Sequence, residues 1–313
     1  MIPKQRHPVF ICTIGVMAVV LLSAFLAPLV KWFFLLFSPY CAVCSSLSEY
    51  ELHRVLSRIF MIGIFLFLFL FRKLLFVGKG LFAPVYFQSG VGKWFLIGFA
   101  LGVATLALQV LLAVIFDARS VNVAGFEWGR FAQKALKAFF SASLIGVIEE
   151  FIFRGVLYGK INRARSFWMA LLISSLIYST AHFFRPKDIA PIDNLTIWSG
   201  FVVLGQILTP FAEPDFIYEA VGLFLVGVCL VFAYRYSKSL YFAIGLHAGW
   251  VFVIKMDGMF VARTLPDLIS LWGSSNIVGG IYTWLLLVII AVFIRVAIPH
   301  IETKINERQI RSV

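Results

Sequence analysis

Long apolar segments separated by short polar ones make up most of the chain. Segment 62–71, IGIFLFLFLF, has the alternation of a strand, but an open strand edge in lipid would leave backbone groups unpaired, so we expect helix. A helix that crosses a bilayer needs roughly 20 apolar residues. The pattern predicts an all-α, polytopic integral membrane helix bundle with about eight transmembrane helices. The expected spans are 9–30, 56–77, 94–116, 139–159, 166–184, 216–234, 239–256 and 276–298.

Two further segments favour elements that do not cross the membrane. Segment 126–140 places Phe and Leu on one side and Arg and Lys on the other, which is typical of an interfacial amphipathic helix leading into the fourth span. Segment 191–215 is apolar but broken by three prolines and two glycines, which indicates an interfacial or re-entrant element packed against the bundle. Since no long polar segment is present, we expect a single integral membrane domain over 1–313.

The composition agrees with this class of protein. The 313 residues are 61% hydrophobic and 13% charged, whereas soluble domains carry about 25% charged residues. The net charge of +12 indicates topology and contact with anionic lipid. With no soluble module, nucleic acid is not an expected partner.

The distribution of basic residues predicts an orientation. If the N-terminus is cytoplasmic, the inner segments carry 15 Lys and Arg against two acids, and the outer segments carry 11 of each. Cytoplasmic loops are enriched in Lys and Arg. We therefore expect both termini in the cytoplasm, with the protein in the inner (cell) membrane of a bacterium.

The four cysteines have different surroundings in the sequence. Cys12 and Cys229 fall inside spans, where we expect them to pack. Cys41 and Cys44 form the motif CAVC in the first outer loop. A disulfide would form there in an oxidising compartment, whereas one CxxC supplies only two of the four ligands that zinc normally takes.

Ionisable residues occur at three places at membrane depth. They are Glu149, Glu150 and Arg154 in the fourth span, His182 near the end of the fifth, and His247 in the middle of the seventh. Intramembrane ionisable groups are functional by default. His7, His53 and His300 are assigned to loops and tails, which leaves these two as the histidines of the spans.

Helical geometry divides the first of these groups. Glu150 and Arg154 are four residues apart and share a helix face, so they can pair. Glu149 is rotated by about 100° from Glu150 and has no opposite charge on its own helix, so His182 and His247 are its candidate partners. Small residues flank His247 in IGLHAG; they allow either a close helix crossing or room for a substrate.

Three motifs now carry a resemblance. EEFIFR (149–154), YSTAH (178–182) and HAGWV (247–251) follow one another on three main spans. In this order they resemble the motifs of the CPBP family of glutamic intramembrane proteases, which includes the CAAX prenyl endopeptidases and the bacterial relatives formerly called Abi. The resemblance covers 140–255, the motif-bearing core, and is strongest to the bacterial branch.

The resemblance implies a role for each matching residue. Glu149 would activate water, His182 would help to hold that water, and His247 would donate to the oxyanion, with Glu150 and Arg154 as the supporting pair. The family often has Asn four residues after the last His, where this chain has Val251. Trp250 has an N–H group, so Trp250 and Val251 are the candidate oxyanion or pocket positions.

The implied activity is endopeptidase cleavage of a membrane-anchored protein or peptide within the lipid bilayer, with no cofactor and no metal ligands. Three other functions stay open. Two His and one Glu could instead hold zinc in a membrane protease. Glu and His in spans also serve as proton relays in transporters. Because of Val251, a non-proteolytic immunity or binding protein of the same family is the third.

Overall fold

The computed structural model describes residues 8–70, 91–122, 126–183, 190, 192, 194–212, 216–262, 268–273 and 277–310. Within these ranges the chain is helical apart from turns, and one isolated antiparallel bridge joins Val121 to Val261. The predicted all-α class is confirmed. The contacts divide the chain into two compact units, residues 1–81 with 183–213, and residues 82–182 with 214–313. The single domain predicted over 1–313 stays a prediction.

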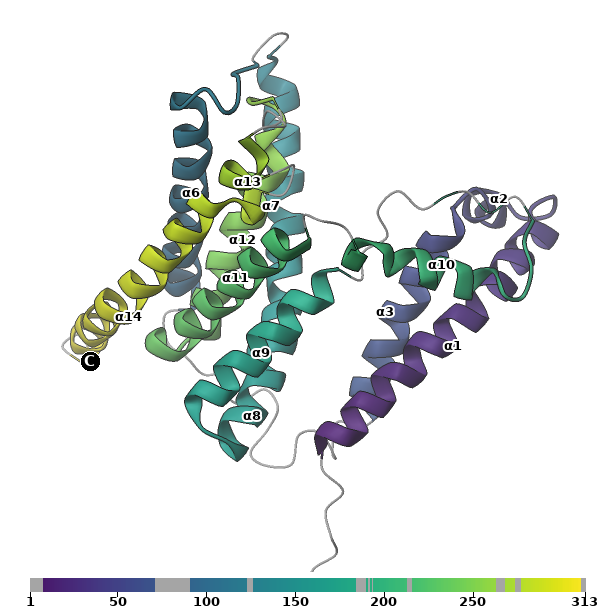
Figure 1. The fold of residues 1–313 in the computed structure, drawn as a ribbon, viewed down its shortest axis with the longest axis horizontal. Coiled ribbons are helices and arrows are strands. Elements are labelled where there is room, and N and C mark those ends of the chain that lie inside the picture. Colours follow the sequence, from purple (N-terminus) through teal and green to yellow (C-terminus); the bar gives the residue numbers. More distant parts are fainter. Residues whose placement is uncertain are drawn as a thin grey trace, which may run out of the picture. The chain divides into compact units, whose positions relative to one another are not determined.

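The first unit is a helical hairpin with a short helix across it. Helices α1 (Pro8–Phe37) and α3 (Leu52–Leu70) pack on each other, and α2 (Ala42–Ser48) lies in the connection between them. Helix α10 (Ser199–Ile207), followed by a 3-10 turn (Thr209–Ala212), packs on α1 and α3 (Figure 1). Nine residues rise only about 14 Å. Helix α10 is therefore too short to cross a bilayer, and the interfacial or re-entrant position expected for 191–215 stays a prediction.

The second unit is a bundle around α12 (Leu240–Asp257), which packs against α6 (Val91–Ile115), α7 (Trp128–Glu150) and α11 (Phe216–Ser237) (Figure 1). Helix α11 also contacts α9 (Phe167–His182) and α14 (Ile281–Ile310). The remaining elements of this unit are a π-helical segment (Phe151–Tyr158), α8 (Gly159–Ala164), α13 (Ile269–Trp272) and a 3-10 turn (Ile277–Gly279).

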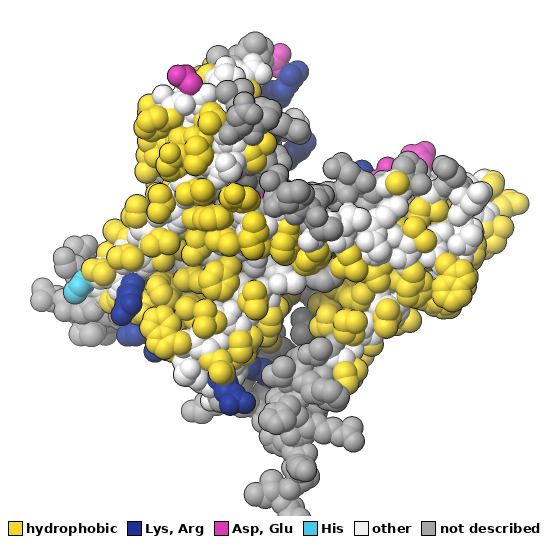
Figure 2. Space-filling view, viewed as in Figure 1, with side chains coloured by type: hydrophobic (Ala, Val, Ile, Leu, Met, Phe, Trp, Pro, Cys, Tyr) yellow, Lys and Arg dark blue, Asp and Glu magenta, His cyan; other side chains and the backbone are white. Residues whose placement is uncertain are grey.

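Five described helices are long and apolar enough to cross a membrane by length and composition: Ile14–Phe37 of α1, Val91–Ile115, Phe216–Ser237, Leu240–Asp257 and Ile281–Ile301 of α14. Helix α9 is a shorter apolar helix of 16 residues. Helix α3 is described as far as Leu70, and the rest of the predicted span 56–77 lies outside the described residues. The exposed apolar side chains cover the helical surfaces, as a bilayer requires (Figure 2).

Segment 126–140 leads directly into the fourth span, as predicted, because α7, the π-helical segment and α8 follow one another from Trp128 to Ala164. No proline interrupts this stretch, so nothing in the backbone forces a break where the polarity changes. The interfacial position of 126–140 stays a prediction. The expected span 166–184 is too long, since α9 ends at His182.

Glycines allow α6 and α12 to approach until their backbones touch. A Cβ built on Gly98 would lie 2.3 Å from the carbonyl oxygen of Phe242, and one on Gly249 would lie 2.4 Å from that of Phe99. Gly102 and Gly245 make equally close approaches. Among the two explanations for the small residues near His247, Gly245 and Gly249 therefore serve the helix crossing, as small residues do in membrane interfaces.

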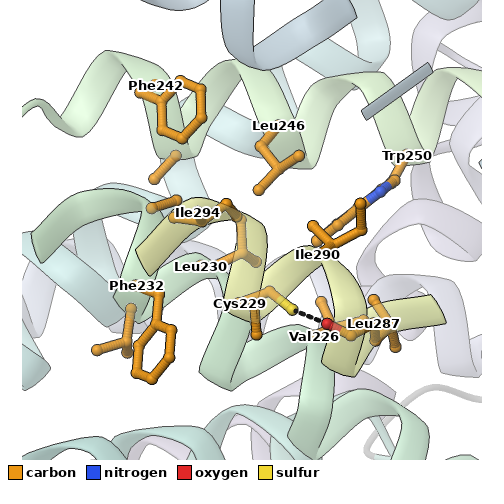
Figure 3. Close-up of a cluster of buried hydrophobic side chains, with 14 of the residues drawn as sticks. Val226, Cys229, Leu230, Phe232, Phe242, Leu246, Trp250, Leu287, Ile290 and Ile294 are labelled. Atoms are coloured by element: carbon orange, nitrogen blue, oxygen red, sulfur yellow. Dashed lines mark hydrogen bonds between the residues drawn. The ribbon is translucent and has the colours of Figure 1, made fainter. Parts of the chain in front are cut away.

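The apolar core of this unit lies on the other side of α12. Side chains of α11, α12 and α14 point toward one another there (Figure 3). Cys229 is buried among them, and its thiol donates to the carbonyl of Leu287 at 3.1 Å. The packing role predicted for Cys229 is confirmed, while the side chain of Cys12 lies outside the described residues.

A buried ion pair joins the loop after α6 to the end of α12. Arg119 Nη1 and Nη2 lie 3.0 and 2.8 Å from the two carboxylate oxygens of Asp257, and Arg119 Nε donates to the Ala262 carbonyl at 3.0 Å. Both side chains are less than 10% exposed. Two-point pairing of this kind fixes geometry as well as charge, so it holds the far end of α12 in register with α6.

The close crossing gives a first prediction. Gly98→Ala should lower the free energy of unfolding by about 1–3 kcal/mol, because the new methyl group meets backbone that cannot move aside. Gly92→Ala is the matched control on the same helix, since nothing lies within 4 Å of its Cβ position. The measurement is thermal unfolding of both purified variants in detergent. Equal midpoints for the two would contradict the crossing.

Candidate active site

The structure brings the three sequence motifs together in the second unit. Glu149 and Glu150 end α7, His182 ends α9, and His247 lies near the middle of α12. Glu149 Oε2 lies 3.5 Å from His182 Nε2 and 3.9 Å from His247 Nε2. The two imidazoles thus converge on one carboxylate oxygen, as the helix geometry of the sequence predicted.

His182 is the last residue of α9, a helix of 16 residues. The C-terminal end of α9 lies beside Glu149, with His182 Nε2 3.5 Å from Glu149 Oε2.

Glu150 and Arg154 form the predicted pair in full burial. Arg154 Nη1 lies 2.9 Å from Glu150 Oε1, and the two side chains are 1% and 0% exposed. The same carboxylate oxygen lies 2.9 Å from His247 Nδ1. Glu150 therefore has two partners, one on its own helix and one on α12.

Two further groups surround the Arg154 guanidinium, and the sequence reasoning assigned neither of them to it. Arg154 Nη2 donates to the carbonyl oxygen of Gly227 on α11 at 3.3 Å. The guanidinium carbon lies 4.5 Å from the ring centroid of Tyr178, within the range of a cation–π interaction. Tyr178 was visible in the motif YSTAH, but only the fold shows that its ring covers Arg154.

The backbone changes its winding directly after Glu150. Residues Phe151–Tyr158 form a π-helix, and the amide of Gly159 bonds to the Arg154 carbonyl five residues earlier. Such wider turns inside α-helices occur frequently at functional sites. The sequence has no signal that predicted this segment.

His182 is oriented by the backbone of its own helix. Its Nδ1 lies 2.9 Å from the Tyr178 carbonyl oxygen. A carbonyl only accepts, so Nδ1 carries the proton and donates it. In a neutral ring Nε2 is then an acceptor, and it is the atom that faces Glu149.

The two candidate oxyanion positions differ. The Trp250 indole N–H donates to Thr105 Oγ1 of α6 at 2.9 Å, and Trp250 is 6% exposed. Val251 lies one turn after His247 and is half-buried. Thr105 was not among the expected residues, since a hydroxyl in an apolar span is a weak signal.

The remaining histidines do not belong to this site. His53 and His300 lie in α3 and α14, not in loops as predicted, and His53 Nδ1 is 3.3 Å from Glu51. His7 lies outside the described residues. Among the described ranges, no group of three or more His, Cys, Asp and Glu side chains has a spacing that could hold a metal ion.

Comparison with known proteins agrees with the motifs. The family profile "Type II CAAX prenyl endopeptidase Rce1-like" matches residues 131–253, the segment that holds all three motifs. This match supports the resemblance of the motif-bearing core to the CPBP family. The membrane-embedded CAAX protease MroQ of Staphylococcus aureus (strain USA300) is 29% identical over 40% of this chain. The match covers 65% of the length of that relative, and no solved structure matches this chain.

The segment matched by the profile covers less than half of the chain. Residues 131–253 run from α7 to α12 and include α10 of the first unit. The matched segment therefore contains both carboxylates and both histidines, while α6, whose glycines and Thr105 hold α12, lies before it. By their names, both matches are CAAX proteases, and the relative is a membrane-embedded one.

The buried pair gives a second prediction. Arg154→Gln should destabilise the protein by about 3–5 kcal/mol, because it leaves the fully buried Glu150 without its guanidinium. The control is Arg130→Gln, at another position on α7. It removes an exposed partner of Glu127 and should lower the free energy of unfolding by at most about 1 kcal/mol. Thermal unfolding of the two variants measures the difference. A similar small loss for both would show that the pair is not a structural requirement.

Proposed function

We propose that this protein is an intramembrane endopeptidase of the glutamic type, which hydrolyses a peptide bond of a membrane-anchored protein or peptide. The observation that carries the proposal is the position of Glu149 Oε2 between the Nε2 atoms of His182 and His247. A general base must lie within reach of the proton it removes, directly or through one water. Here Glu149 Oε2 and the Nε2 atoms of His182 and His247 surround a position that a water and the reacting peptide bond would occupy.

Glu149 and His182 are suited to hold the attacking water together. Their facing atoms, Oε2 and Nε2, are both acceptors when Glu149 is ionised and His182 neutral, and they are 3.5 Å apart. Water bridges polar atoms that lie farther apart than 3.5 Å, so Glu149 and His182 would separate slightly to admit it. A bridging water would donate one proton to each atom and direct its oxygen lone pairs outward. Glu149 would take the proton as the oxygen attacks the peptide carbonyl.

His247 is suited to stabilise the oxyanion. Its Nδ1 lies 2.9 Å from Glu150 Oε1, which also binds Arg154. For Nε2 to donate while Nδ1 donates to Glu150, the ring must carry both protons. Nε2 would then donate to the negative charge that develops on the carbonyl oxygen. Glu149 would return its proton to the leaving amine nitrogen.

Neither Val251 nor Trp250 offers a second hydrogen bond to the oxyanion. Val251 has no side-chain donor, and the N–H of Trp250 is bonded to Thr105. We therefore assign the oxyanion to His247 and give Trp250 a packing role. In other enzymes, removal of one oxyanion donor lowers the rate by about 10²–10³-fold, so we expect a modest turnover.

The charge distribution supports the proposed orientation. Arg163, Arg165, Arg235 and Lys238 are exposed at the end of the second unit where α8, α9, α11 and α12 meet through short turns. No acidic residue occurs in 151–187 or in 220–256. Lys and Arg are visible at this end of the unit in Figure 2. By the positive-inside rule this end is cytoplasmic, with both termini on the same side, in the inner membrane of a bacterium.

The third prediction tests the base. Glu149→Gln should reduce cleavage of a membrane-embedded peptide substrate by at least about 10³-fold, because an amide cannot accept the proton. Glu127→Gln, an exposed carboxylate on the same helical stretch, should cleave at the parental rate. The assay uses purified protein in lipid vesicles with a panel of membrane peptides. Retention of most activity by Glu149→Gln in folded protein would end the proposed role of Glu149.

The fourth prediction separates this chemistry from a zinc protease. Cleavage should continue at the same rate after prolonged dialysis against a strong chelator, since the proposed steps need only Glu149, His182 and His247. Elemental analysis of the washed protein should find less than one zinc per chain. Activity that is lost on chelation and restored by zinc would favour the His₂Glu zinc site instead.

A further inference from the structure

The motif CAVC has no part in the proposed active site, and its structure is specific. Cys41 is the N-cap of α2, with an extended backbone, and Cys44 lies in the first turn. The amide of Cys44 donates to Cys41 Sγ at 3.2 Å. Both side chains are half-buried, and neither forms a disulfide.

The surroundings of α2 hold this pair in place. Helix α2 packs on α1, and Lys31 of α1 donates through Nζ to the carbonyl oxygens of Ser48 and Tyr50 at the end of α2. The last four carbonyl groups of a helix lack hydrogen-bond donors within the helix. Lys31 donates to one of them, the carbonyl of Ser48. The short helix is therefore anchored at its end while the two thiols stay accessible at its beginning.

The two thiols are chemically unequal. Hydrogen bonds from the Cys44 thiol and amide lower the pKa of Cys41. The bond to Cys41 raises the pKa of Cys44, together with a smaller effect of burial. In exchange reactions the thiolate is the nucleophile, and the N-terminal cysteine of a Cys-X-X-Cys motif commonly has the lower pKa. The geometry thus separates an attacking sulfur from a resolving one.

We propose that Cys41 and Cys44 form a thiol–disulfide exchange site that reacts with disulfide compounds. The Cys41 thiolate attacks one sulfur of the disulfide R–S–S–R, so that the S–S bond breaks, a mixed disulfide forms and one thiolate leaves. The Cys44 thiolate then attacks Cys41 Sγ, closes the Cys41–Cys44 bond and releases the second thiolate. The pair loses two electrons and two protons, and the compound becomes two thiols.

The site stands apart from the proposed protease function. Cys41 and Cys44 belong to the first unit, whereas Glu149, His182 and His247 belong to the second. The Glu149→Gln protein should therefore exchange as the parental protein does, which distinguishes a failure of this proposal from a failure of the protease assignment.

The test uses the full chain in lipid nanodiscs with glutathione disulfide as the probe. We expect mass spectrometry of peptides to find the Cys41–Cys44 disulfide in the parental protein. Cys44→Ser should stop at the Cys41–glutathione mixed disulfide, and Cys41→Ser should form its mixed disulfide at least about tenfold more slowly near pH 7. Cys229, which is 1% exposed, is the internal control and should stay unmodified.

Three results would overturn the proposal. The first is absence of the Cys41–Cys44 disulfide under conditions that modify exposed thiols. The second is equal rates of mixed-disulfide formation in the two serine variants, with unchanged thermal unfolding. The third concerns pH: in parental protein titrated with iodoacetamide, we expect Cys41 to alkylate at lower pH than Cys44, and the reverse order would exclude Cys41 as the attacking sulfur.

Discussion

The burial of Glu150 and Arg154 is the constraint on which the rest of the second unit depends. Removing two charges from water costs several kcal/mol each, and attraction repays this only when the remaining hydrogen-bonding groups are also satisfied. Three other helices supply partners: the Gly227 carbonyl of α11, the Tyr178 ring of α9 and the His247 imidazole of α12. These contacts join the helices that carry the site. Among the described residues, Glu150 Oε2 has no hydrogen-bond partner.

The same arrangement gives adjacent carboxylates different tasks. Glu150 is 0% exposed and bound to Arg154 and His247, while Glu149 is 21% exposed and faces both histidines at longer distances. Two carboxyl groups in different environments can hold different protonation states. In the proposed reaction Glu150 orients His247 through its hydrogen bond to Nδ1, and Glu149 exchanges a proton with water.

Support for His247 comes from the crossing of α6 and α12. Glycines on α6 and α12 bring the two backbones into contact, and the Trp250–Thr105 hydrogen bond lies one turn from His247. Substantial overpacking of such an interface shifts backbone as well as side chains. The position of His247 relative to Glu150, 2.9 Å away, therefore depends on α6, outside the segment matched by the family profile.

The sequence by itself determined the membrane class, the all-α fold and the pairing of Glu150 with Arg154, because apolar length and four-residue spacing are local properties. It also predicted that Glu149 would meet His182 and His247, from helix faces alone. Tertiary structure decided the rest: the end of α9 at His182, the continuity of α7 with the next helix, and the donation of the Trp250 N–H to Thr105. These depend on which helices touch and at what depth, and an apolar segment has the same composition whichever neighbour it meets.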